Sequence, residues 1–285
     1  MKPLLLPHRP FPARLDLALA RSCARMIQHA YAMFDQWEQG RPRQTDFTWH
    51  PPAPAGPRIT YGQPLWATYR YARVVRPANP KLPPTHTWED RDCPVGFTAT
   101  APGRIYVIFR GTQTYHEWMK VNFKFVQKDC DYDRFGQGRA HEGFLAYYRT
   151  LRRTLEQRLS ALNPAGKELV FAGHSLGGAM STLSAHDAAE EAYPNATFTH
   201  FSFGAPRVFD PVLAAYYESL PITTFRFVNV EDMVTTVPPP NLTRLDFQHV
   251  GTPLSFSAHY GSIAANHHMD NYRYALDHPS RPQRA

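Results

Sequence analysis

The segment FAGHSLGGAM, residues 171–180, places Ser175 two residues from a glycine on either side. An apolar run precedes this serine and an alanine-rich run follows it, which predicts a strand, a sharp turn and a helix. Such a turn strains its central residue and brings flanking side chains against the crossing backbone, so glycine is required there. The Ser175 hydroxyl is therefore expected at the carboxyl edge of a sheet, beside the positive end of a helix, where it could act as a nucleophile.

A serine nucleophile needs a base to accept its proton, and the base needs a carboxylate to orient it. The segment FRFVNVEDM ends an apolar strand near Val230, with Glu231 and Asp232 at its carboxyl edge. This is the same edge of the sheet that Ser175 is expected to reach. Asp232 is the predicted acid, and Glu231 is the alternative.

The base is a histidine downstream of the acid, and position alone does not decide which one. Five histidines follow Asp232 in the chain: His249, His259, His267, His268 and His278.

The elements that must position these groups alternate along the chain. Four apolar strands are predicted at 105–109, 169–172, 199–203 and 225–230, and amphipathic helices at 15–38 and 144–162. A shorter strand is expected near 66–75, inside an irregular, proline-rich stretch from 40 to 84. Short apolar strands separated by helices are typical of an α/β fold, with a mostly parallel central sheet and helices on both faces.

The length and composition of the chain limit the class of protein. The 285 residues are 43% hydrophobic and 19% charged, which predicts one globular domain over 1–285. No apolar run approaches the roughly 20 residues of a membrane-spanning helix, so no transmembrane segment is expected. The first residues do not form a signal peptide, which leaves a cytoplasmic location, or export after loss of a leader, both open.

Charge and cysteine usage exclude other classes. The formal charge of +7 is spread along the chain without a dense basic tract, so no nucleic-acid partner is expected. Three cysteines without CxxC spacing argue against both a disulfide framework and a structural zinc site. No metal is expected.

Five blocks in this order resemble the class 3 lipases, the fungal-type branch of the α/β-hydrolase superfamily. They are IFRGT (108–112), AHEGF (140–144), AGHSLGGA (172–179), SFGAPRV (202–208) and VNVEDMVTTVPP (228–239). The resemblance implies an α/β-hydrolase fold. The chain departs from the secreted fungal members in having three cysteines where they usually carry disulfides, in reading TTVPPP after the acid, and in GAPR where relatives often read GQPR.

The resemblance also implies roles for further residues. NHHMDNY matches a family segment H-x-M-x-x-Y that carries the base, which makes His267 the preferred base and His268 the alternative. In the family, two backbone amides form the oxyanion hole, which places it at Leu176 and Thr112. A serine, histidine and aspartate triad needs no cofactor.

A lid is expected from the same resemblance around 113–122. Tyr115, Trp118 and Met119 would form its apolar face, and a strand with alternating apolar residues would follow over 121–125. A second candidate for a mobile cover is 245–265, which carries Phe247, Leu254 and Phe256.

The predicted function is that of a triacylglycerol lipase or other carboxylic ester hydrolase, acting on a lipid or ester substrate at an oil–water or membrane interface. A phospholipase A1 or a short-chain esterase would use the same triad, and the sequence does not distinguish these enzymes well from a triacylglycerol lipase. An inactive hydrolase-like module that binds a lipid or a protein is the alternative from another class. The oligomeric state stays open.

Overall fold

A computed structural model describes the chain over the following residues: 6–7, 11–75, 85–112, 126–132, 136, 138–191, 193–240 and 245–279, with side chains from 11–68 and from 90 onward within these ranges. The predicted lid at 113–122, with Tyr115, Trp118 and Met119, and the strand predicted at 121–125 lie outside the described residues.

A mostly parallel sheet of eight strands runs through the molecule, in the order β1-β10-β9-β8-β7-β4-β3-β2. Its parallel strands are β4 (Arg104–Phe109), β7 (Glu168–His174), β8 (Thr197–Phe203), β9 (Ile222–Asn229) and β10 (Thr252–Ser257). The antiparallel strands at its two ends are β1 (Leu6–Pro7), β2 (Thr60–Val75) and β3 (Thr85–Ala101). The four strands predicted from apolar runs and the α/β-hydrolase type of sheet are confirmed.

The register of the parallel strands brings their carboxyl ends to one edge. Phe109 of β4 lies opposite Gly173 of β7, and Phe203 of β8 lies opposite His174 on one side and Phe227 on the other. The segments that follow these strands therefore leave the sheet side by side, as parallel strands require.

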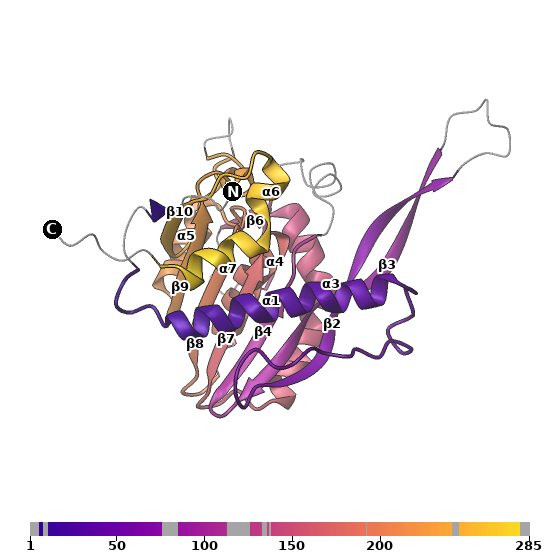
Figure 1. Ribbon diagram of the computed structural model, residues 1–285, viewed down its shortest axis with the longest axis horizontal. Helices are drawn as coiled ribbons and strands as arrows, with labels where there is room; N and C mark the ends of the chain where they lie inside the picture. The colour runs from indigo at the N-terminus through magenta and orange to yellow at the C-terminus, as the bar shows by residue number, and fades with distance from the viewer. Residues whose placement is uncertain are drawn as a thin grey trace.

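Helices cover both faces of the sheet, and each face has its own core. On one face, α1 (Leu17–Glu38) and α7 (Met269–Asp277) contact each other and cross in front of the strands (Figure 1). The helices α3 (Glu142–Ala161) and α4 (Leu176–Glu190) contact each other on the opposite face. Strand β7 alternates between the two cores: Val170 belongs to the core under α1, and Phe171 to the core under α4.

Smaller elements complete the described chain. They are α5 (Pro211–Ser219), α6 (Ile263–His267), the 3₁₀ helix η1 (Met233–Thr236), and a separate two-stranded sheet of β5 (Gln127–Asp129) and β6 (Arg139–His141). Among the described helices, none is both long enough and apolar enough to cross a bilayer.

Two expectations differ from the structure. The short strand expected near 66–75 is part of the 16-residue β2, which pairs with β3 in a hairpin that projects beyond the rest of the sheet (Figure 1). The mobile cover expected over 245–265 is wrong, because this segment contributes β10 to the sheet. Phe247, Leu254 and Phe256 are all buried in the core, so their apolar side chains stabilise the fold and do not cover a site.

Candidate functional site

Ser175 occupies a strained turn between β7 and α4. Its backbone lies at φ 57° and ψ −126°, a region that residues other than glycine rarely adopt. A Cβ atom on Gly173 would stand 1.9 Å from the carbonyl oxygen of Gly177, and a Cβ on Gly177 would stand 2.4 Å from that of Arg110. The two glycines predicted to flank the serine are therefore required by backbone contacts.

The turn sets Ser175 against the start of α4. The amide of Ser175 donates to the carbonyl of Phe203 in β8 at 3.0 Å, which ties the turn to the neighbouring strand. Leu176 is the first residue of α4, so its N–H has no carbonyl one turn earlier within the helix to bond to. This amide and the positive end of the helix dipole are available at the serine for a negatively charged atom.

Asp232 and His267 are brought together from segments 35 residues apart. Nδ1 of His267 lies 2.6 Å from Oδ2 of Asp232. The carboxylate is completely buried and is held on its other sides, since Oδ1 accepts from the amide of Val234 at 2.9 Å and Oδ2 also accepts from the Tyr272 hydroxyl. Burial, together with the charge of Asp232, raises the pKa of Tyr272 well above its usual value and keeps this tyrosine a donor.

The alternatives for the acid and the base point elsewhere. The Glu231 carboxylate lies 3.3 Å from the ring of His259 and 3.4 Å from the hydroxyl of Ser257. Nδ1 of His268 lies 3.3 Å from the amide and 3.4 Å from the carboxylate of Asp270. The backbone turns between α6 and α7 at this point, which separates the directions of the two adjacent histidine rings.

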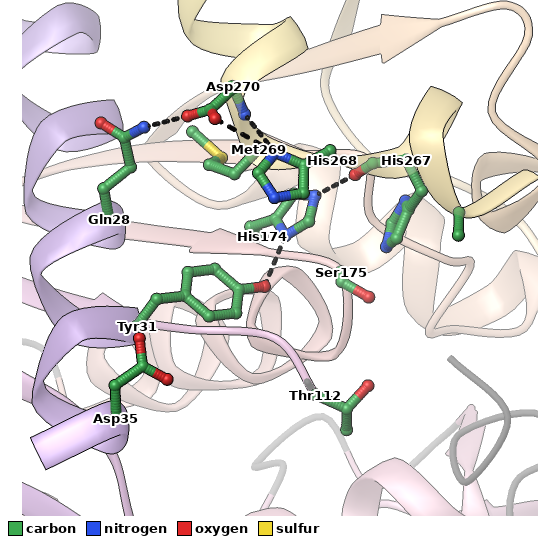
Figure 2. A pocket seen from close by; sticks show the side chains of 11 residues that line it. Gln28, Tyr31, Asp35, Thr112, His174, Ser175, His267, His268, Met269 and Asp270 are labelled. Atoms are coloured by element: carbon green, nitrogen blue, oxygen red, sulfur yellow. Dashed lines mark hydrogen bonds and ion pairs between the residues drawn. The ribbon is translucent and has the colours of Figure 1, made fainter. Parts of the chain in front are cut away.

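Ser175, His267 and Thr112 line one pocket of about 370 Å³ (Figure 2). Because Asp232 engages Nδ1 of His267, the Nε2 atom is on the opposite side of the ring, away from the acid. Asp232 and His267 thus form a carboxylate–imidazole pair of the kind that activates a serine, and Ser175 lines the same pocket as this imidazole.

Thr112 is positioned by a close backbone approach at Gly111. A Cβ on Gly111 would stand 2.7 Å from the Cβ of Ser175, so only glycine lets this loop pass so near the serine. The loop is held by the buried Arg110, which donates to the carbonyls of Pro94 at 3.0 Å and Gly111 at 2.6 Å. The backbone of the loop is thereby fixed beside the serine.

Tyr31 and His174 form a hydrogen-bonded chain that sequence reasoning missed (Figure 2). Nε2 of His174 lies 2.8 Å from the carbonyl of His267, so Nε2 carries the proton. Nδ1 then accepts from the Tyr31 hydroxyl at 2.7 Å, and the tyrosine oxygen accepts from the amide of Gly111 at 2.9 Å. The chain joins the loop before Thr112, the nucleophile turn and the segment of the base.

Burial keeps His174 neutral in this chain. Its pKa is well below the usual value because the ring is desolvated and because a charge on His267 would repel its own. The two rings stack with centroids 4.6 Å apart. The motif GHSLG could have drawn attention to His174, whereas nothing in the pattern of α1 distinguishes Tyr31 from its other core residues.

One group of acids among the described residues could in principle hold a cation, and it lies away from the pocket. Glu156, Asp187 and Glu191 bring carboxylate oxygens within 4.8 Å of one another. Arg152 already donates to both oxygens of Asp187, at 2.8 and 3.0 Å, and Tyr148 donates to one of them at 2.7 Å. The buried carboxylate of Asp187 is therefore already paired with a positive charge, that of Arg152.

Comparisons with known proteins agree with this geometry. Residues 106–242 match the family model described as Lipase (class 3). A secreted mono- and diacylglycerol lipase of Fusarium solani is 31% identical over 144 residues, which are 50% of this chain and 41% of that protein. Phospholipase A1 EG1 of Oryza sativa subsp. indica is 29% identical over 204 residues, 59% of this chain and 46% of the relative. The chain thus spans less than half the length of these relatives.

A solved structure shows that the fold is shared more widely than the sequence. The triacylglyceride lipase of Rhizomucor miehei superposes with a TM-score of 0.60 at 21% identity, covering 87% of this chain and 82% of the other.

Proposed function

Because residues 106–242 belong to the class 3 lipase family, we propose that this chain is a serine carboxylic ester hydrolase that acts on acyl esters of lipids. One observation carries the proposal: a histidine bonded at 2.6 Å to a buried aspartate shares a pocket with a serine on a strained turn. That combination activates a hydroxyl for acyl transfer.

In the proposed reaction, Ser175 Oγ attacks the ester carbonyl while Nε2 of His267 takes its proton. Asp232 holds the imidazole in the required tautomer and stabilises its positive charge. His267 then protonates the departing alcohol, which leaves an acyl group on Ser175. A water molecule, deprotonated by the same histidine, releases the acid.

The oxyanion of the tetrahedral intermediate would rest on two backbone amides, those of Leu176 and Thr112. Fixed donors aimed at a developing charge contribute on the order of 3 kcal/mol each to lowering the barrier. The support for Leu176 is its place at the start of α4, and the support for Thr112 is the rigid approach of the loop at Gly111.

The substrate class follows from relatives and from the surface beside the site. Relatives are named as a mono- and diacylglycerol lipase and a phospholipase A1, so an acylglycerol is proposed first and a phospholipid is the alternative. Four of the six exposed large hydrophobic side chains among the described residues flank the segments of the acid and the base: Val230, Met233, Tyr260 and Ile263. We propose that these side chains contact the oil or membrane phase, and that the segment 113–122 is the lid.

Replacement of the nucleophile tests the proposal directly. Ser175→Ala should abolish hydrolysis of a p-nitrophenyl ester and labelling by a fluorophosphonate, with an unchanged circular dichroism spectrum. Ser181→Ala, in the same helix α4 and bonded to a helix carbonyl at 2.9 Å, is the matched control and should retain both. Labelling that persists in Ser175→Ala would refute the assignment.

A further inference from the structure

The wall of the pocket between α1 and α7 carries several polar side chains. Gln28 and Asp35 face it from α1, and His268 and Asp270 face it from the segment after the base (Figure 2). Among the described lining residues, only Ala264 and Met269 lack a side-chain nitrogen or oxygen. A fatty acyl chain lying against these four groups would displace their water without offering a hydrogen-bond partner in its place, which costs free energy.

The polar groups of this wall are held in fixed orientations. The amide of Gln28 donates to Oδ1 of Asp270, and its carbonyl oxygen accepts from Arg273 at 2.7 Å. Oδ2 of Asp270 lies 3.4 Å from Nδ1 of His268. The wall thus presents an oriented carboxylate beside an imidazole, and Arg273 is bonded to the carbonyl oxygen of Gln28.

The exposed apolar residues Met233 and Ile263 lie in η1 and at the start of α6, and neither lines the pocket. The polar wall follows His267, through His268 and Asp270, and is completed by α1. An ester bound at Ser175 must direct its alcohol oxygen to His267, which protonates it, so the alcohol lies close to the segment that follows this histidine.

We propose that the wall formed by Gln28, His268 and Asp270 is the subsite for the leaving alcohol, and that it selects neutral alcohols with free hydroxyl groups, such as the glycerol of a monoacylglycerol. This inference rests on the proposed ester hydrolase function. A free hydroxyl donates to the Asp270 carboxylate and accepts from, or donates to, the His268 ring. A phosphate on the alcohol meets the carboxylates of Asp35 and Asp270 and is repelled.

Three substrates with one acyl chain separate these effects. Methyl laurate has no free hydroxyl, monolauroylglycerol adds two, and lauroyl glycerol phosphate adds a negative charge to the same glycerol. All three are presented to the full-length protein in micelles of one uncharged detergent, and kcat/KM is measured. Monolauroylglycerol should exceed methyl laurate by about 25-fold, since each of its two hydroxyls forms a hydrogen bond that contributes roughly a factor of five, and the phosphate ester should be slowest.

Variants of the wall should change the ratios between substrates. Gln28→Leu frees the Asp270 carboxylate from its orienting partner and should reduce the preference for monolauroylglycerol over methyl laurate about fivefold. Asp270→Asn removes a negative charge at nearly constant volume and should raise the relative rate of the phosphate ester severalfold. Gln39→Leu, at the C-cap of α1, and Asp277→Asn, in α7, make the same changes outside the pocket and should keep the parent ratios.

The outcomes distinguish this inference from the function on which it rests. A folded protein that neither reacts with a fluorophosphonate nor hydrolyses any of the three esters overturns the hydrolase proposal and the subsite with it. A labelled, active protein whose substrate ratios match in Gln28→Leu, Asp270→Asn and their controls overturns the subsite alone. Faster turnover of the phosphate ester than of monolauroylglycerol does the same.

Discussion

The nucleophile turn and the segment of the base are held in different ways. Around Ser175 the backbone itself makes the contacts: Gly173 and Gly177 meet neighbouring carbonyls with no space for a side chain. Around His267 the contacts are side-chain hydrogen bonds from distant segments, through Asp232 and His174. The first region is rigid because of local packing, and the second depends on the assembly of the whole fold.

The largest effect is expected where the base meets its acid. Asp232→Asn keeps the shape but supplies an amide to Nδ1, which favours the wrong tautomer of His267, so kcat on a p-nitrophenyl ester should fall about 10⁴-fold. Glu231→Gln is the matched control, because that carboxylate contacts His259 and Ser257 instead. It should change kcat less than twofold, and comparable losses in both variants would mean that Asp232 is not the acid.

The same comparison applies to the two adjacent histidines. His267→Ala should reduce kcat to the level of Ser175→Ala, because no other described histidine is bonded to the buried Asp232. His268→Ala removes a ring that faces Asp270 and should retain most of the activity on a methyl ester. The reverse ranking, measured by steady-state kinetics with the two purified variants, would assign the base to His268.

In the nucleophile turn the main effect should be on stability. Gly173→Ala forces a Cβ against the Gly177 carbonyl, so the backbone must move, and the free energy of unfolding should fall by about 3 kcal/mol or more. Urea denaturation followed by circular dichroism measures this loss. Gly40→Ala, where the nearest atom to the new Cβ is 3.9 Å away, should cost less than about 0.5 kcal/mol. Equal midpoints for the two variants would contradict the packing argument.

Acid should weaken the fold through histidines that are buried in the neutral form. Burial lowers the pKa of His200 and of His249 to about 3, from 6.5. The unfolded chain therefore binds protons below pH 6.5 that the folded chain excludes, so stability is complete above pH 6.5 and declines as the pH falls toward 3. Each such group should cost about 2 kcal/mol between pH 7 and pH 5.

Urea midpoints measured across this pH range test the expectation. A variant that removes a titrating ring, His200→Gln, should have a shallower dependence on pH than the parent. His259→Gln, with a side chain 67% exposed, should keep the parent slope. A parent whose stability is constant from pH 7 to pH 5 would contradict the burial argument.

The smallest effect is expected from the chain that links the two regions. Tyr31→Phe removes the donor to His174 and the acceptor for the Gly111 amide, so kcat should fall about fivefold while KM stays near the parent value. A loss of packing alone would lower the yield of folded protein and leave kcat per labelled active site unchanged. Fluorophosphonate titration therefore distinguishes a loss of catalytic rate from a loss of packing. Tyr274→Phe on α7 serves as the control.

The fold could be predicted where its signals are local. The apolar runs of β4, β7, β8 and β9 and the helical spacing of α1 and α3 are patterns within a single element. Only the second half of β2 was predicted, as a short strand near 66–75. The rest of the hairpin of β2 and β3 and the strand β10 were not, since proline, glycine and serine obscure their alternation. Their place in the sheet depends on pairing with strands far along the chain.

The sequence by itself determined the turn at Ser175 and placed the adjacent acids Glu231 and Asp232 at the end of β9, because glycine spacing and a strand terminus are properties of consecutive residues. Tertiary structure decided which histidine ring faces Asp232, and it alone placed Tyr31 against His174, 143 residues away. The physical reason is that hydrogen bonds between distant segments depend on where the folded backbone directs each side chain. The side chains of the adjacent residues His267 and His268 point in different directions only once α6 and α7 have packed.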